Sequence, residues 1–220
     1  MIAKYIVCDV GDEQRASFSN AQLAWKELNT CEGFLGQLGG WDIVTGKATI
    51  LGLWKDLSSF QHFMNLRHDR IARANRQKRT YLHCATTLSN QLGRISAYGN
   101  PSFESLDHIG FIRIADCIVY PDERTNFEKT QQNTWNPGMT ACSGMLGGFW
   151  GKSIDEPLRY LVTSFWTNEK SHRLYEKHSL PLLKEKSSPG KCIQELKSYR
   201  IDVEKQWTVP RFGTSVRTSE

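Results

Sequence analysis

Apolar and polar residues alternate along four short segments in the first part of the chain, which is the pattern of half-buried β-strands. The predicted strands cover residues 3–10, 33–41, 48–54 and 80–88. Two stretches between them have helical spacing instead. Their predicted inward residues are Phe18, Leu23, Ala24 and Leu28 in the first stretch and Phe60, Phe63, Met64 and Ile71 in the second. The predicted order is β-α-β-β-α-β, the ferredoxin-like or split βαβ pattern.

Capping and turn residues mark the ends of these elements. Asp12 stands where it could cap the first helix, and Asp56 or Ser58 could cap the second, because such side chains accept hydrogen bonds from free backbone N–H groups. Thr45 and Gly46 predict a turn between the two middle strands. We therefore expect a central hairpin with one helix before it and one after it.

The same order of elements returns in the second half of the chain, where four short segments match the first half. They are FSNAQ (18–22) with FEKTQ (127–131), CEGFLG (31–36) with CSGMLG (142–147), LGLW (51–54) with TSFW (163–166), and HCATTL (83–88) with KCIQEL (191–196). All four offsets are about 110 residues, which indicates one duplicated unit with small changes in loop length. The second set of elements is expected to begin near Ile109, Asp122, Met139, Leu158, Asn168 and Lys191.

Two such units in tandem predict an α+β fold. We expect the first unit to span residues 1–90 and the second to span 108–209. The intervening 91–107 is the natural linker, because this part of the chain is rich in serine, glycine and asparagine. Residues 210–220 are predicted to form a polar C-terminal tail.

Each unit is rich in glycine in the first strand of its hairpin, in GFLGQLGGW (33–41) and SGMLGGFWG (143–151). Glycine weakens a strand unless a bulge, a bend or a close approach requires it. Two explanations for these glycines are compatible with each other. The first, which we favour, is that the strand curves toward a barrel. The second is that glycine leaves room for a ligand against the backbone.

Composition and charge narrow the class of protein. Of the 220 residues, 39% are hydrophobic and 23% are charged, as in ordinary globular domains. No apolar run is long enough to span a membrane, and the N-terminal residues lack a signal-peptide cleavage site, so we expect a cytoplasmic protein with no membrane partner. Much of the net charge of +5 lies in residues 67–79 and 184–205. No nucleic-acid motif accompanies them, so we expect solvated helix faces and no nucleic-acid partner.

The six cysteines occupy three equivalent positions in the two units. The equivalent pairs are Cys8 with Cys117, Cys31 with Cys142, and Cys84 with Cys192. Inherited small thiols at buried positions explain this pattern. The alternative is a symmetric metal or redox site, although the local spacings are not those of a metal site.

Taken together, these features resemble the dimeric α+β barrel superfamily, which includes the antibiotic-biosynthesis-monooxygenase-like proteins. The resemblance is carried by the element order, by the Gly-Phe-x-Gly step that opens the hairpin, and by a tryptophan that ends the next strand before a helix with a late histidine. The segments FLGQLGGW, ILGLWKD, FMNLRHD and YRIDVEKQWTV are similar to its YdbC-like branch of tandem bacterial proteins. The resemblance implies one pseudo-two-fold barrel formed within the chain, with a pocket between sheet and helices in each unit. It leaves open a homodimer of the whole chain.

The resemblance also implies candidate catalytic residues. His68 and His178 come late in the second helix of their units, at unequal spacings after Trp54 and Trp166. A histidine in this region of the superfamily can face the pocket, and imidazole suits proton transfer near neutral pH. The alternative is a surface histidine that interacts with the negative end of the helix dipole.

The remaining candidates are expected to line the pockets and contact a small-molecule ligand. They are Gln37, Gly39, Trp41, Trp54 and Phe63 in the first unit and Trp150, Trp166 and Tyr175 in the second. The tryptophans that end equivalent strands have a second interpretation as core aromatics. The amide of Gln37 either faces solvent or points into the pocket. Because Gly148 replaces Gln37 in the second unit, the first unit is the better candidate site.

Several other kinds of site find no support in the sequence. It contains no GxGxxG before a helix, no GxSxG, no HExxH and no paired CxxC, so we expect neither a cofactor nor a metal. Haem-degrading members of the superfamily carry an asparagine on the first strand, and a tryptophan followed by a histidine in the second helix. Here the strand reads YIVCDV, Phe63 and Tyr175 replace the tryptophan, and Arg73 and Glu185 replace the histidine. That activity is therefore not expected.

Three functions fit these observations. The first is a small-molecule enzyme, a cofactor-independent oxygenase or isomerase acting on an aromatic or polyketide-like compound, in which His68 moves a proton and backbone amides of the glycine segment stabilise negative charge. The second is a non-catalytic ligand-binding or stress-related protein that uses the same pocket. The third, a nucleic-acid or membrane-surface binder, is the least favoured. The sequence does not decide between the first two.

Overall fold

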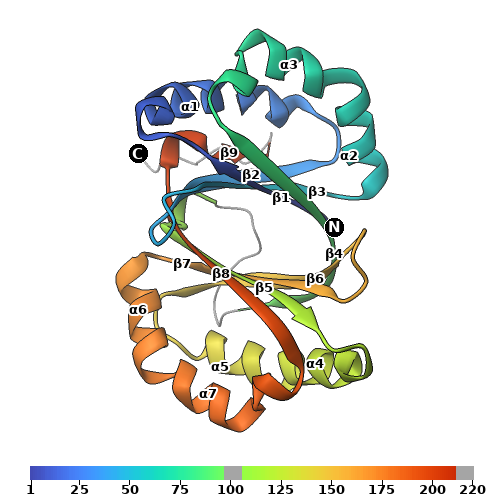
Figure 1. The fold of residues 1–220 in the computed structure, drawn as a ribbon, viewed down its shortest axis with the longest axis vertical. Helices are drawn as coiled ribbons and strands as arrows, with labels where there is room; N and C mark the ends of the chain where they lie inside the picture. Colours follow the sequence, from blue (N-terminus) through green and yellow to red (C-terminus); the bar gives the residue numbers. More distant parts are fainter. Residues whose placement is uncertain (97–105, 212–220) are drawn as a thin grey trace, which may run out of the picture.

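The computed structural model describes residues 1–96 and 106–211. These residues form two consecutive βαββαβ units, so the predicted element order is confirmed (Figure 1). The strands of the first unit are β1 (Ile2–Asp9), β2 (Phe34–Asp42), β3 (Ala48–Trp54) and β4 (His83–Ile95). Those of the second are β5 (Phe111–Val119), β6 (Met145–Ser153), β7 (Arg159–Trp166) and β8 (Ile193–Val203), and the short β9 (Val209–Pro210) follows.

The helices lie on the outside of the strands and are interrupted by short 3-10 and π-helical turns. The first unit has α1 (Arg15–Gln22), extended by a 3-10 segment over Leu23–Thr30, then α2 (Leu57–Phe63), a π-helical turn over Met64–His68, and α3 (Asp69–Ala74). The second has α4 (Arg124–Thr130), a π-helical turn over Gln131–Trp135, α5 (Asn136–Thr140), α6 (Glu169–His178) and α7 (Leu180–Ser187). The strand that was expected near Met139 begins only at Met145, because α5 occupies the residues before it.

The predicted caps are confirmed at one helix and wrong at another. The Asp56 carboxylate caps α2 by accepting a 2.8 Å hydrogen bond from the Ser59 N–H. Asp12 does not cap α1, because it lies inside a separate 3-10 turn, and α1 begins after Gln14 without a side-chain cap.

Within the described residues, eight strands close into one antiparallel barrel. The order around it is β3-β1-β4-β6-β7-β5-β8-β2, and β2 pairs back with β3. The two units meet at two seams, where β4 pairs with β6 and β2 pairs with β8. The expected α+β barrel formed by one chain is therefore confirmed. Strand β4 continues past the expected end of the first unit to Ile95, so that residues 91–95 of the expected linker belong to a seam. The parts of the expected linker and tail at 97–105 and 212–220 lie outside the described residues.

The glycines of the hairpins serve the curvature of the barrel. The pairing of β2 with β3 shifts register at Gly36, and that of β6 with β7 shifts at Gly147; both glycines have positive φ, 145° and 135°. These β-bulges bend their strands. At the β2–β8 seam, a Cβ on Gly40 would lie 1.8 Å from the backbone oxygen of Asp202. Strand bending and strand approach therefore account for these glycines.

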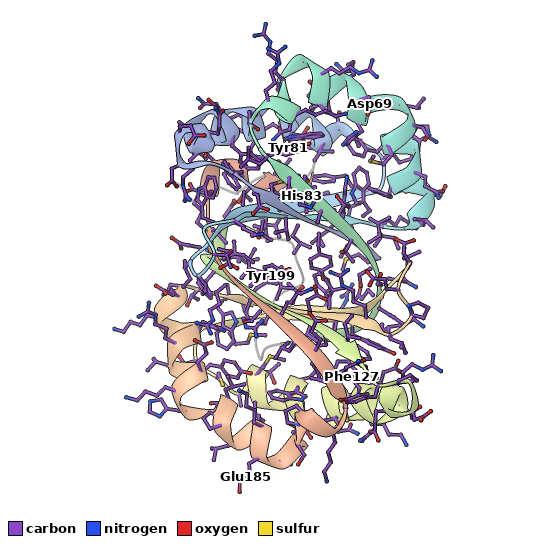
Figure 2. All side chains as sticks on the ribbon, in the orientation of Figure 1. Asp69, Tyr81, His83, Phe127, Glu185 and Tyr199 are labelled. Carbon is purple, nitrogen blue, oxygen red and sulfur yellow. The ribbon has the colours of Figure 1, made fainter. Side chains whose placement is uncertain are left out.

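The molecule has two helical layers with the barrel between them. Helices α1 to α3 cover the strands of the first unit, and α4 to α7 cover those of the second (Figure 1). Apolar side chains from both units, including Leu38, Ile112 and Phe165, fill part of the barrel interior. Figure 2 shows Tyr199 inside the barrel, between the strands of the first unit and those of the second, and Phe127 near the helices of the second unit. In the part of the chain that the structure describes, no helix is both long and apolar enough to cross a membrane.

Candidate functional site

A cavity of about 570 Å³ lies between the strands and helices of the first unit; we call it the first-unit cavity. Alternation along β1 turns Lys4, Ile6 and Cys8 toward this cavity, while Tyr5 points into the barrel. Helices α1, α2 and α3, with the 3-10 and π-helical turns that extend them, close the other side of the cavity. Tyr81 also lines it, and Figure 2 shows this residue in the layer between β4 and the helices.

Aromatic rings form much of the cavity wall. The Trp54 ring is stacked on Phe63, with 4.9 Å between centroids, and meets Phe60 edge-on at 5.9 Å. The Trp25 ring meets Phe63 edge-on at 6.5 Å, and its indole Nε1 donates a 3.0 Å hydrogen bond to Oε1 of Gln77. Trp54 is buried, so this residue belongs to the core and also lines the cavity. Such rings offer flat apolar surface to a planar ligand.

His68 reaches the rim of this cavity from the last position of the π-helical turn. Its ring lies 5.5 Å from the Trp25 ring and 5.9 Å from the Phe63 ring, and its side chain is 26% exposed. Its Nδ1 is 3.0 Å from Oδ1 of Asp69, and this hydrogen bond lowers the pKa of the Asp69 carboxyl below its ordinary value. The contact gives the imidazole a preferred orientation, and π-helical turns are frequent at functional sites.

Lys4 places a positive charge in this apolar cavity and was not among the site residues predicted from the sequence. Its Nζ lies 3.7 Å from the Met64 sulfur and 5.4 Å from the centre of the Phe60 ring. No carboxylate among the described residues lies within ion-pair distance of it, and burial lowers the pKa of its ammonium group. The sequence did contain a clue to this position of Lys4. In a β-strand, Lys4 lies on the same face as the apolar residues Ile2 and Ile6, which are two positions away on either side.

The other candidates of the first unit divide into two groups. Gln37 is buried and lines the cavity, and its Nε2 donates a 3.3 Å hydrogen bond to the backbone oxygen of Trp207. Gly39 faces Trp207 and backbone atoms of β3 and is not among the cavity residues. Trp41 also lies elsewhere, with the Arg15 guanidinium 3.7 Å from its ring centre. The structure thus brings Gln37 together with Trp54, Phe63 and His68.

The cysteines do not repeat their contacts between the units. Cys8 and Cys84 face each other across β1 and β4 with their sulfur atoms 3.2 Å apart, and both line the first-unit cavity. The contact with Cys8 lowers the pKa of the Cys84 thiol. In the second unit, Cys117 is instead paired with Leu196 in the sheet. Equivalent sequence positions therefore do not produce two equivalent thiol sites.

A smaller cavity of about 290 Å³ occupies the corresponding place in the second unit; we call it the second-unit cavity. Tyr175 lines it, and Trp166 packs beneath Tyr175 with ring centres 5.1 Å apart. Trp150 is buried in the adjacent core, and His178 is exposed at the end of α6; neither is among the residues of this cavity. The two units therefore differ in shape as well as in residues.

His172, and not the predicted His178, is the histidine that lines the second-unit cavity. It is only 1% exposed and lies between the rings of Phe111 and Trp166, at 5.0 and 5.3 Å. The repeat could have predicted this position of His172. His172 follows Trp166 at the same spacing at which the inward-facing Phe60 follows Trp54.

The barrel interior holds a third cavity of about 460 Å³. Asp116 is buried there and accepts hydrogen bonds of 2.8 and 2.7 Å from Nε and an Nη of Arg159. This contact raises the pKa of the Arg159 guanidinium. The charges facing this cavity are thus largely paired, in contrast to Lys4.

Comparisons with known proteins agree with this architecture. Residues 2–88 match a family described as a domain of unknown function, DUF4937. Over 91 residues the chain is 32% identical to the uncharacterized protein YdbC of Bacillus subtilis strain 168, and this alignment covers 40% of the chain and 76% of YdbC. The family match falls within the first unit.

Solved structures similar to this chain extend over both units. One is a protein of Lactobacillus acidophilus NCFM described as a proposed monooxygenase, with a TM-score of 0.71, 11% identity and 96% of each chain covered. Another is an anthrone oxidase-like protein, with a TM-score of 0.72, 8% identity, and 99% of this chain and 96% of that chain covered. At these identities the similarity shows a shared fold.

Proposed function

The chain belongs to the YdbC-like branch of the antibiotic-biosynthesis-monooxygenase-like α+β barrel proteins, and from this we propose that its first-unit cavity binds a small aromatic or polyketide-like compound and acts on it as a cofactor-independent oxygenase or isomerase. The observation that carries the proposal is a cavity in which aromatic walls, the histidine His68 and the cation Lys4 meet, and no carboxylate in the described part of the chain forms an ion pair with Lys4. These are the groups needed to hold a planar acid, remove its proton and stabilise the anion.

The chemistry follows from the placement of these groups. A phenolic or enolic ring lies in the cavity against the apolar wall that Trp25, Trp54 and Phe63 form together. His68 accepts the acidic proton of the ligand, and Asp69 stabilises the resulting imidazolium. The ammonium of Lys4 favours the anionic form of the ligand, because a cation in an apolar cavity is poorly screened.

Both candidate reactions begin from that anion. In an isomerase, His68 returns the proton to a different atom of the ligand, and the overall reaction is a proton shift. In an oxygenase, the deprotonated carbon of the anion gives one electron to dioxygen, and the superoxide formed combines with the ligand radical at that carbon. Protonation gives a hydroperoxide, which breaks its O–O bond and loses water to leave a carbonyl group, so the substrate supplies all the electrons. The protein supplies deprotonation, orientation and exclusion of water in either case.

The test uses anthrone, a planar compound whose deprotonated form reacts with dioxygen. Binding is followed under nitrogen by quenching of tryptophan fluorescence, and turnover is followed in air by oxygen uptake and anthraquinone absorbance. We expect His68→Gln to bind anthrone within about twofold of wild type while turnover falls about 100-fold or more, the usual effect of losing a general base. The matched control is His62→Gln, because His62 lies exposed on the preceding helix α2.

Two outcomes would contradict parts of the proposal. Turnover that is unchanged in His68→Gln would exclude His68 as the base. Binding without any turnover in the wild-type protein would instead support the non-catalytic ligand-binding alternative, which needs the aromatic walls and no proton acceptor.

A further inference from the structure

The second-unit cavity contains an unusual pair of cations. Arg113 on β5 and Arg200 on β8 are direct partners in the antiparallel sheet, and both line the cavity. Like charges directly opposite each other on neighbouring strands are destabilising. Such a pair therefore calls for negative charge nearby.

The protein itself provides only part of that negative charge. Glu176 on α6 forms an ion pair with Arg200, with 3.2 Å between its Oε1 and the arginine Nε. No carboxylate in the described ranges, 1–96 and 106–211, lies within ion-pair distance of Arg113, whose guanidinium donates a hydrogen bond to the backbone oxygen of Ile114. Burial lowers the pKa of Arg113. Glu176 thus contacts only one of the two guanidinium groups, and Arg113 has no carboxylate of the described residues in contact with it.

His172 is an unused hydrogen-bonding group in the same cavity. Its side chain is 1% exposed, and neither ring nitrogen has a hydrogen-bond partner among the residues that the structure describes. The nearest carboxylate oxygen, on Glu176, is 3.7 Å from Nδ1, too far for a hydrogen bond. Burial, together with Arg113 and Arg200, lowers the pKa of His172 to about 3, so the ring is neutral and offers one donor and one acceptor. A buried polar group without a partner is costly unless a ligand satisfies it.

The other residues that line the second-unit cavity favour a ligand whose uncharged part is apolar and small. Apolar side chains that line the cavity include Phe127, Trp135, Met139 and Val162. With about 290 Å³, this cavity is about half the volume of the first-unit cavity, which has about 570 Å³. It suits a ligand of one ring or a branched chain with one charged end.

We propose that the second-unit cavity is a separate binding site for a small organic carboxylate with an apolar body. The carboxylate pairs with Arg113 and Arg200, the neutral imidazole of His172 donates a hydrogen bond to it, and the body lies against Phe127 and Trp135. A planar carboxylate matches the fork of a guanidinium. The site does not depend on the function proposed for the first unit.

The test compares benzoate with benzamide, which has the same shape and no charge. Isothermal titration is performed at constant ionic strength in a buffer free of carboxylates. We expect benzoate to bind wild-type protein at least about tenfold more tightly than benzamide, and Arg113→Gln to lose about tenfold or more of that affinity, as for a lost charged hydrogen bond. Lys170→Gln is the charge-matched control, because it removes one positive charge from the exposed surface of α6.

Two further variants show which cavity binds benzoate and keep the test informative if Arg113→Gln does not fold. His172→Gln keeps a polar side chain in the cavity, and we expect it to weaken benzoate binding severalfold even if Arg113→Gln fails to fold. Lys4→Gln removes the cation of the first-unit cavity and is expected to leave benzoate affinity within twofold. The proposal is overturned if benzoate and benzamide bind equally, if His172→Gln binds benzoate as wild type does, or if the loss follows Lys4→Gln.

Discussion

Replacing His172 with phenylalanine is expected to make the protein less sensitive to acid. Phenylalanine already occupies the equivalent position in the first unit, Phe60, so the change introduces a residue that the fold accommodates. In the folded protein, burial and the neighbouring Arg113 and Arg200 lower the pKa of His172 from 6.5 to about 3. Glu176, 3.7 Å from Nδ1, is the one carboxylate near the ring in the described residues.

The sign and size of the effect follow from this pKa difference. Between pH 6.5 and about 3, the unfolded chain binds a proton at His172 that the folded protein does not bind, so the stability contributed by the neutral ring is present above pH 6.5 and is lost as the pH falls. The slope approaches about 1.4 kcal/mol per pH unit. From pH 7.5 to pH 5.0 the free energy of unfolding falls by roughly 2 kcal/mol through this one residue.

Urea unfolding at pH 7.5 and pH 5.0 measures the effect. Other titrating groups contribute to the pH dependence of both proteins, so the informative quantity is the difference between the wild-type loss and the His172→Phe loss. We expect the wild-type protein to lose roughly 2 kcal/mol more than the variant. Equal losses in the two proteins would refute the reasoning, as would an imidazole NMR signal of His172 that titrates near pH 6.5.

Two further predictions concern the barrel. Gly40→Ala is expected to lower the free energy of unfolding by about 3 kcal/mol or more in urea titrations, because the new Cβ would lie 1.8 Å from the Asp202 backbone oxygen. The control Gly190→Ala should change the free energy of unfolding very little, because no atom lies within 4 Å of the new Cβ. Equal effects of the two variants would contradict the close packing at the β2–β8 seam. Arg159→Met is expected to cost roughly 3 kcal/mol, since it leaves buried Asp116 without its cation, and Asp116→Asn in the same chain should restore part of the loss. A double variant no more stable than Arg159→Met would count against this explanation.

Local patterns along the chain were sufficient to predict most of the fold. Alternation and helical spacing depend on nearest neighbours in sequence, so β3 was predicted with the same bounds, 48–54, that the structure has. The repeat then predicted a second copy of the same elements. The misplacement of Asp12 as a cap and of the strand near Met139 shows the limit of such reasoning at element ends, where short 3-10 turns and α5 intervene.

The candidate site was predictable only in part. The aromatic residues Trp54 and Phe63 could be placed because they follow strand and helix periodicity, and His68 because the resemblance pointed to it. Trp41 was expected in a pocket because it lies beside the glycine segment, and His178 because of the same resemblance as His68, but the structure places both elsewhere. Side-chain direction changes with each residue, so proximity in sequence does not establish a shared cavity.

The sequence by itself determined the duplicated unit, the order of its elements and the faces that must be buried, because these depend on spacing within a segment. Only the tertiary structure decided which charges lie together. Lys4 lies in an apolar cavity with no carboxylate of the described residues within ion-pair distance, and Arg113 lies opposite Arg200, because strands distant in sequence are brought into one register. That register is set by barrel closure at the β4–β6 and β2–β8 seams and by the bulge at Gly36 in the pairing of β2 with β3. A single shift of one residue would turn these side chains to the other face of the sheet.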